Sequence, residues 1–83
     1  MFKFYGYSRD SNEDIPTELK EVSVLADPEL LKRLGQFFLS CASEIEVDKN
    51  LKWEHKHFQD VDSNLSPQYP DFIVVNSQAY KES

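Results

Sequence analysis

The first hydrophobic pattern along the chain is an alternation with period two. Over residues 1–8, Phe2 and Phe4 fall on one side and Tyr5 and Tyr7 on the other. Because successive side chains of a strand point to opposite faces, this alternation predicts a strand that turns Phe2 and Phe4 toward the core. Tyr5 and Tyr7 are then expected on the opposite face.

A second alternating stretch follows a polar interval. Residues 9–17 are rich in turn formers and acidic residues and contain Pro16, which cannot donate to a strand ladder, so we expect an exposed loop. Residues 19–26 alternate again and place Val22 and Val24 on one side. The two alternating stretches therefore predict two strands joined by this loop.

After residue 27 the apolar period becomes that of a helix. The helix start is marked by Asp27-Pro28-Glu29, because aspartate accepts hydrogen bonds from free amides, proline suits the first turn and glutamate complements the dipole. The broad apolar stripe expected to pack on a sheet consists of Leu30, Leu31, Leu34, Phe37, Phe38, Cys41, Ala42 and Ile45. Phe38 lies at the middle of this stripe, so Phe38→Ala is predicted to cost about 3–5 kcal/mol. Gly35 lies at its edge, where we expect a close approach to the sheet.

Two more strands are expected after the helix. Residues 51–60 alternate between apolar and polar positions and predict a third strand. Residues 61–70 carry Asp, Ser, Asn and Pro and predict a loop. Residues 72–75 form a continuous apolar run, which is expected for a strand covered on both faces, and Asn76 begins a polar tail.

The expected fold class is α+β with the element order β-β-α-β-β. We expect a four-stranded, mainly antiparallel sheet with one long amphipathic helix packed on one face, in a single domain over residues 1–83. One helix leaves the other sheet face open, and Tyr5, Tyr7 and Trp53 are expected there as aromatic contact residues. Loops that fold back over this face are the alternative.

Charge narrows the classes of partner. Fifteen Asp and Glu residues against nine Lys and Arg give a net charge of −6, which disfavours nucleic-acid binding and steers the chain toward a basic protein such as a nuclease. Glu44, Glu46 and Asp48 concentrate acid near the C-terminal end of the predicted helix, where the helix dipole disfavours it. This cluster is a candidate patch for a partner, and an ordinary solvated surface is the alternative.

Cysteine content and the distribution of apolar residues indicate the cellular compartment. The single cysteine, Cys41, cannot form an internal disulfide, and the first residues lack the charged and apolar regions of a signal peptide. No stretch reaches the roughly 18 apolar residues of a membrane span. We therefore expect a cytoplasmic protein that has no membrane partner.

Little in the sequence points to chemistry. His55 and His57 share a strand face and could supply two metal ligands, but zinc sites need more ligands, so we expect no metal site. Asp60, Asp62 and Asn64 match the start of a calcium loop whose later Gly and Glu are absent. No catalytic or phosphate-binding motif is present, so we expect neither enzymatic activity nor a cofactor. A small metal-dependent protein built on the two histidines is a minor alternative.

Short motifs spread over nearly the whole chain carry a resemblance. They are Phe4-Tyr5-Gly6-Tyr7-Ser8, Asp27-Pro28-Glu29-Leu30 with Phe37-Phe38-Leu39, Glu54-His55-Lys56-His57 and Pro70-Asp71-Phe72-Ile73-Val74-Val75-Asn76. Together they resemble the small immunity proteins of bacterial polymorphic toxin systems, in particular the immunity family numbered thirty-two. The resemblance implies matching positions at Glu54, His55, His57, Asp60 and Asp71. Each of these residues is either structural or faces the toxin.

The resemblance implies a protein that is encoded beside a secreted toxin and binds and neutralises that toxin. Combined with the charge, it predicts an acidic and aromatic contact surface for a cognate toxin. The alternative is a homodimeric structural or regulatory binding module with no toxin partner, whose open sheet face pairs with a second copy.

Overall fold

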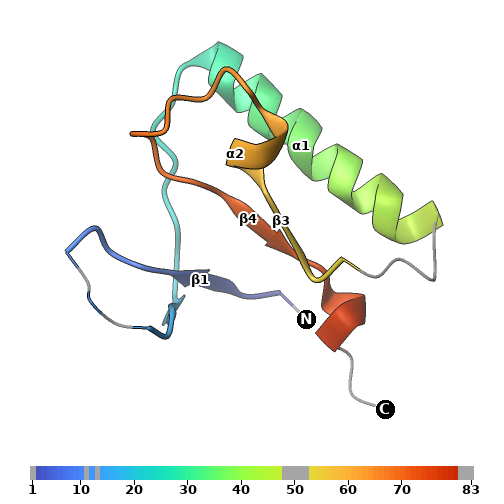
Figure 1. The fold of residues 1–83 in the computed structure, drawn as a ribbon, viewed down its shortest axis with the longest axis horizontal. Helices are drawn as coiled ribbons and strands as arrows, with labels where there is room; N and C mark the ends of the chain where they lie inside the picture. The colour runs from blue at the N-terminus through green and yellow to red at the C-terminus, as the bar shows by residue number, and fades with distance from the viewer. Residues whose placement is uncertain (1, 11, 13, 48–52, 81–83) are drawn as a thin grey trace.

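One long helix and two small antiparallel sheets make up the chain, which is therefore of the α+β class (Figure 1). The computed structural model describes residues 2–10, 12, 14–47 and 53–80. In chain order the elements are β1 (Phe4–Gly6), β2 (Thr17–Leu19), α1 (Pro28–Val47), β3 (His55–His57), α2 (Phe58–Val61), β4 (Ile73–Val75) and the 3-10 helix η1 (Ser77–Tyr80). Within this part of the chain, no helix has the length and apolar character needed to span a membrane.

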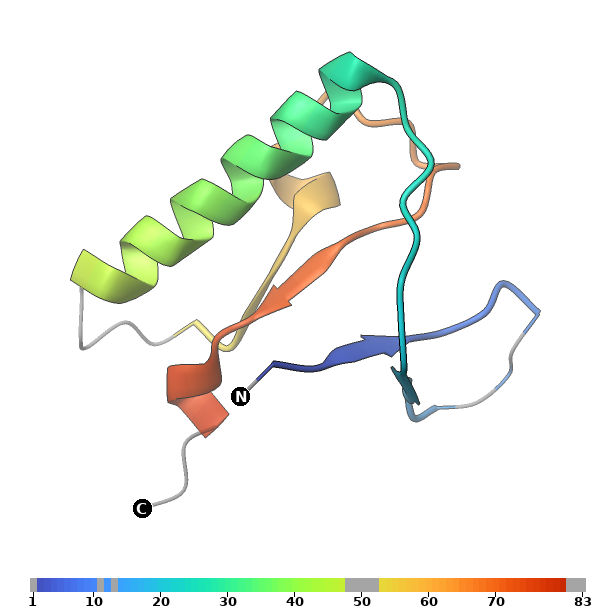
Figure 2. The ribbon, with the colours of Figure 1, turned by 180° about the vertical axis from the view of Figure 1, so that it is seen from behind.

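The two sheets are separate antiparallel pairs. Strand β1 pairs with β2, with Phe4 opposite Leu19, and β3 pairs with β4, with Lys56 opposite Val74. The prediction of one four-stranded sheet is therefore wrong: β1 pairs with β2 only, and the hairpin is not hydrogen-bonded to the β3–β4 sheet (Figure 2). Each strand has only three residues, so each ladder offers few hydrogen bonds with which to hold a further strand.

The predicted second strand, residues 19–26, is mostly a connector. The strand ends at Leu19, and residues 21–27 run without regular structure to the start of α1. Val22 and Val24 are exposed along this connector, so these alternating side chains do not pack against the core. Alternation alone does not make a strand, because the backbone also needs a neighbour to satisfy its hydrogen bonds.

Helix α1 begins as predicted. Asp27 caps it: its Oδ1 accepts a hydrogen bond from the Leu30 amide at 2.8 Å, and its backbone oxygen accepts one from Leu31 at 3.0 Å. The cap leaves the first turn with satisfied amides, and Glu29 adds the negative charge that this end of a helix favours. The prediction of a long amphipathic helix is confirmed.

The buried stripe of α1 is narrower than predicted. Only Leu34, Phe37 and Cys41 are buried, whereas Phe38 is 38% exposed. The expected close approach at Gly35 is also wrong, since a Cβ there would meet nothing within 4 Å. A two-stranded sheet and the four-residue α2 cover only the central line of the helix, so residues at the borders of the stripe stay open to water.

The core is small and lies between α1 and α2. Phe37 and Phe58 are its largest members, with ring centroids 5.3 Å apart, and Leu34 and Cys41 complete it. The partly buried residues that pack against this group are Leu30, Trp53, Leu65, Phe72 and Val74. No hairpin residue is among these described core residues.

Helix α2 replaces the second half of the predicted third strand. Strand β3 stops at His57, and the chain turns into α2, which brings Phe58 into the core at 4% exposure. The turn is fixed by Asp71, whose Oδ1 accepts a hydrogen bond from the Gln59 amide at 2.9 Å. Residues 51 and 52, the predicted beginning of that strand, lie outside the described residues.

Strand β4 lies where predicted but is not covered on both faces. Val74 packs toward the core, whereas Ile73 and Val75 are 43% and 53% exposed. A strand that is buried on both faces needs elements on either side, and here α1 lies on one side only (Figure 1).

Asn76 is the fully buried polar residue of the described chain, not the start of a polar tail. Its Nδ2 donates a hydrogen bond to the Trp53 backbone oxygen at 3.0 Å, and its Oδ1 accepts one from the Gln78 amide at 3.0 Å. The asparagine therefore joins the approach to β3, the end of β4 and the start of η1.

Candidate functional site

The chain exposes more surface than a closed domain of its mass. Its accessible area is 7460 Å² for 9.7 kDa, whereas a folded monomer of this mass exposes about 5,100 Å². Its radius of gyration is 13.9 Å, against about 12 Å for an ordinary domain of 83 residues. The excess of about 2,300 Å² is larger than one partner's share of a standard protein interface, about 800 Å². The open surfaces are therefore the candidate functional sites.

One face of the β1–β2 hairpin is apolar. Phe4 and Leu19 are cross-strand partners and are half-buried, and the Phe2 ring packs edge-on against Phe4 at 5.0 Å. Gly6 leaves room for the Leu19 side chain, because a Cβ at Gly6 would lie 3.0 Å from Leu19 Cδ1 and the leucine would have to shift. Phe2 and Phe4 share one side, as predicted, but they face no core residue.

The opposite face of the hairpin is aromatic and polar. Tyr5 and Tyr7 are more than half exposed, as the alternation predicted. Tyr5 lies opposite Glu18, whose carboxylate is 4.0 Å from Lys3 Nζ. The Tyr7 hydroxyl donates a hydrogen bond to the Asp14 backbone oxygen at 3.2 Å, which holds the following loop beside the strand.

The hairpin carries several acidic residues, of which Glu18 lies opposite Tyr5 and Asp14 accepts the Tyr7 hydroxyl hydrogen bond through its backbone oxygen. Asp10, Asp14, Glu18 and Glu21 are exposed on the hairpin or just after it. Arg9 donates a hydrogen bond to the Gln68 backbone oxygen at 3.1 Å, and this bond ties the hairpin loop to the segment before β4. The hairpin is thus held in place while both of its faces stay accessible.

Glu44 and Trp53, two predicted contact residues, come together in an internal cluster. Lys56 Nζ donates hydrogen bonds to Glu44 Oε1 at 2.7 Å and Oε2 at 2.9 Å, and it lies 5.3 Å from the centroid of the Trp53 ring. Trp53 Nε1 also donates to Glu44 Oε1, at 3.3 Å. The hydrogen bond from Lys56 is the main reason that the pKa of Glu44 is lowered. The Glu44 carboxylate is therefore paired with Lys56 of the same chain, although it remains partly exposed.

This placement corrects two expectations. Trp53 does not join Tyr5 and Tyr7, because it packs half-buried against the core on the side of α1. The acidic cluster at the end of α1 is not one patch either: Glu44 is paired, Glu46 is exposed and Asp48 lies outside the described residues.

The face of β3–β4 that points away from α1 is an open surface. Lys56 turns toward α1, where it pairs with Glu44, so His55 and His57 point to the other side. The two histidine rings lie 5.1 Å apart in an edge-to-face arrangement. Their cross-strand partners are Val75 and Ile73, which makes this face half imidazole and half aliphatic.

Asp71 anchors His57. His57 Nδ1 lies 2.5 Å from Asp71 Oδ2, while Asp71 Oδ1 accepts hydrogen bonds from the backbone amides of Gln59 and Phe72, each at 2.9 Å. This carboxylate therefore holds β3, α2 and β4 together. Asp60 is exposed on α2. The Glu54 backbone oxygen accepts a hydrogen bond from the Asn76 amide. Of the residues carried by the resemblance, Asp71 and His57 thus meet directly.

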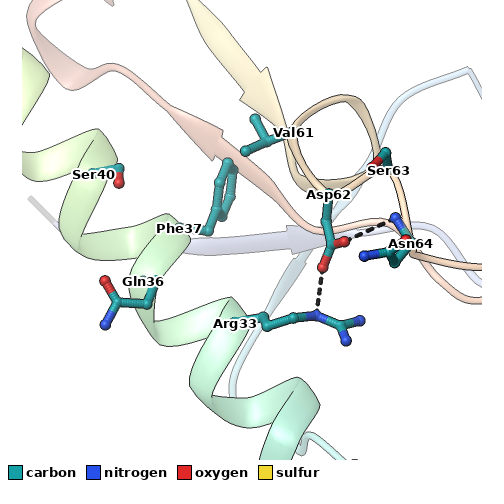
Figure 3. Close-up of a pocket in the computed structure, with 8 residues that line it drawn as sticks. All are labelled: Arg33, Gln36, Phe37, Ser40, Val61, Asp62, Ser63 and Asn64. Atoms are coloured by element: carbon teal, nitrogen blue, oxygen red, sulfur yellow. Dashed lines mark hydrogen bonds and ion pairs between the residues drawn. The ribbon is translucent and has the colours of Figure 1, made fainter.

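The calcium-like motif is a turn closed by an ion pair. Asp62 Oδ2 accepts a hydrogen bond from Arg33 Nε at 2.6 Å, and Asp62 Oδ1 accepts one from the Asn64 amide at 3.0 Å (Figure 3). The pair lines a shallow open groove together with Phe37 and Val61 (Figure 3). In the described part of the chain, no three His, Cys, Asp or Glu side chains are grouped as a metal site would need.

The fold and its open surfaces are those of a small acidic α+β domain that displays a tyrosine-bearing hairpin. No protein family model, no curated protein and no solved structure gives a significant match to this chain.

Proposed function

We propose that this chain is an immunity protein that binds and neutralises a cognate bacterial toxin in the cytoplasm, and that the β1–β2 hairpin is its main contact element. The observation that supports this most is the exposed hairpin face on which Tyr5 and Tyr7 lie beside the acidic residues Asp14 and Glu18. Tyrosine is enriched among residues that contribute most to protein interfaces, because it offers a large rigid contact area with a polar tip.

The charge supports a basic partner. A net charge of −6 attracts a cationic protein such as a nuclease over a distance, and the acidic residues of the hairpin direct that attraction to it. Surface charges of this kind mainly raise the association rate, whereas buried aromatic contacts slow dissociation. Binding to the toxin is therefore expected to weaken as salt is added.

The position of the hairpin also suits a contact element. Its residues contribute nothing to the described core, so a partner can cover both hairpin faces while α1, β3 and β4 keep their packing. The same independence means that hairpin side chains can be replaced with little effect on folding, which makes the proposal testable by mutation.

The test uses the toxin domain encoded beside the gene for this chain. Co-expression of the two should restore growth of a sensitive host, and the purified pair should form a stoichiometric complex. Tyr5→Ala with Tyr7→Ala should weaken binding by about 30-fold or more, the effect of losing a contact worth about 2 kcal/mol. Tyr69→Ala is the matched control, because Tyr69 is 54% exposed and Tyr5 53%.

Two outcomes would refute the proposal. Absence of any complex with the neighbouring toxin domain would remove the immunity function. A complex whose affinity is the same in the Tyr5/Tyr7 variant and in the Tyr69 control would place the contact surface away from the hairpin.

A homodimeric binding module is the second candidate function. The observation that favours it is the uncharged Ile-Val-Val sequence of β4, whose outer edge is not hydrogen-bonded to another strand among the described residues.

A further inference from the structure

Two backbone hydrogen bonds reveal which way the backbone groups of β4 point. The Phe58 amide donates to the Phe72 oxygen at 2.8 Å, and the Asn76 amide donates to the Glu54 oxygen at 2.8 Å. In an antiparallel pair, residues that exchange hydrogen bonds alternate with residues whose backbone groups point away from the partner strand. Positions 72, 74 and 76 therefore point their N–H and C=O groups toward β3.

The intervening residues, Ile73 and Val75, point their N–H and C=O groups out of the free edge of β4. Among the described residues, no backbone hydrogen bond joins this edge to another strand. Strand β1 lies on this side of β4 and runs in the opposite sense, but it pairs only with β2 (Figures 1 and 2). A second copy that adds to this edge must therefore displace the hairpin from it, which breaks the hydrogen bond from Arg9 to the Gln68 backbone oxygen.

This edge lacks the usual protection against pairing. Natural edge strands carry lysine, proline or a bulge that prevents another strand from adding to them. Strand β4 is Ile-Val-Val, with no charge and no proline, and Ile73 and Val75 are 43% and 53% exposed. Such a strand is a template for the addition of one more strand.

We infer that β4 pairs with β4 of a second copy of this chain, antiparallel, about a twofold axis at Val74. In this register Ile73 lies opposite Val75 of the second copy, and by symmetry Val75 lies opposite Ile73 of the second copy. Both residues of each pair have outward N–H and C=O groups, so each pair exchanges two hydrogen bonds. The product is a four-stranded antiparallel sheet in the order β3-β4-β4-β3, with both α1 helices on one face.

The surface fits a second copy in charge. Each chain carries −6 overall, yet the paired strands are uncharged, and Asp71 falls opposite Ser77 of the second copy. Asp71 is in addition paired with His57, so no free acid faces another across the axis. A C2 contact requires a self-complementary patch of this kind, and the register about Val74 supplies it.

The surface also fits in area. Stable interfaces bury about 800 Å² on each partner. The chain exposes about 2,300 Å² more than a closed monomer of its mass, and Ile73 and Val75 are among its exposed large hydrophobic residues. Ile73 and Val75 of both copies would form one aliphatic cluster on the open sheet face, as cross-strand β-branched pairs do.

The first experiment measures mass against concentration by sedimentation velocity. We expect wild-type protein at micromolar concentration to sediment with twice the chain mass of 9.7 kDa. Ile73→Lys with Val75→Lys should raise the dimer dissociation constant about tenfold or more, because each lysine then faces another across the axis. The matched control is Leu31→Lys with Leu39→Lys, which adds the same charge at exposed apolar positions of α1, 46% and 64% exposed.

The second experiment tests the backbone directly. Val75→Pro removes an amide that points out of the free edge and leaves the hydrogen bonds between β3 and β4 in place, so it should give a folded monomer. In wild-type protein, hydrogen exchange at the Ile73 and Val75 amides should slow as concentration rises. The Val74 amide, which points toward β3, should be protected at every concentration.

The results separate the alternatives. A wild-type protein that stays monomeric to millimolar concentration would overturn the inference, as would a dimer that survives both β4 variants. Dimerisation should strengthen with salt because salt screens the repulsion between two chains of charge −6, the opposite of the salt effect expected for the toxin. The Tyr5/Tyr7 variant should remain dimeric, so failure of the toxin proposal and failure of the dimer are distinguishable.

Discussion

Replacing Phe37 or Phe38 by alanine removes the same atoms from adjacent positions of α1, yet the two losses should differ strongly. Phe37 is 3% exposed and packs on Phe58 at 5.3 Å, whereas Phe38 is 38% exposed and meets the Phe72 ring at 5.0 Å. A phenylalanine side chain presents about 200 Å² of apolar surface, and at about 25 cal/mol per Å² its full burial contributes at most about 5 kcal/mol.

Phe37→Ala should therefore cost about 3–5 kcal/mol, since alanine keeps only part of this burial and leaves an enclosed cavity. Phe38→Ala should cost about 2 kcal/mol, because water already reaches the ring and can fill the space that it leaves. The difference in helix propensity is the same in both variants and cancels.

The assay is urea unfolding at one fixed protein concentration, followed by far-ultraviolet circular dichroism and by the fluorescence of Trp53, the single tryptophan. A loss of 3–5 kcal/mol approaches the whole stability of so small a domain, about 4–12 kcal/mol, so Phe37→Leu and Phe38→Leu are measured in parallel and should keep the same order. Equal losses at the two positions, or a loss below about 1 kcal/mol at Phe37, would refute the packing described for α1.

Three further outcomes follow from single side chains. Hydrogen bonds from Lys56 hold the pKa of Glu44 below its ordinary value. The ionised carboxylate therefore stabilises the fold at any pH above that ordinary value, and this stabilisation is lost as the pH falls through the lowered pKa. Glu44→Gln should make the free energy of unfolding, measured in urea, depend less on acid pH. Asp71→Ala should cost about 1–3 kcal/mol through its two backbone amides, against at most about 0.5 kcal/mol for exposed Asp60→Ala, and equal melting temperatures would contradict this. Cys41 is buried, and burial raises the pKa of its thiol. A chromogenic thiol reagent should therefore label Cys41 only when the protein unfolds. Rapid labelling of the folded protein would show that the thiol is accessible.

The helix could be predicted from the sequence because its signals are local. Asp27 lies next to the residues that it caps, and the apolar positions of α1 recur within a few residues of one another. The hairpin alternation that separates Phe4 from Tyr5 is local in the same sense. Predictions of this kind need no knowledge of what lies opposite in space.

Contacts that join distant parts of the chain could not be predicted in this way. In the sequence, Glu44 has the features of an unpaired acid near a helix end, because its partner Lys56 lies 12 positions later and meets it only in the folded chain. Asn76 follows an apolar run like any tail residue, yet it reaches the Trp53 backbone 23 positions away. Strand pairing has the same difficulty, because alternation shows which side chains share a face but not which strand will lie alongside.

The buried side chain of Asn76 also protects this chain from chemical ageing. An asparagine followed by serine is prone to deamidation: the backbone nitrogen of the next residue attacks the side-chain carbonyl carbon, ammonia leaves, and water opens the resulting cyclic imide to aspartate or isoaspartate. In the folded chain both ends of that amide are held by hydrogen bonds, to Trp53 and from Gln78, so the carbon is kept from attack by Ser77. Once formed in an unfolded molecule, the resulting aspartate would bring a carboxylate to a site that needs an amide donor, and refolding would require it to be buried. The fraction of chains deamidated at Asn76 would then record how often each molecule has opened during storage.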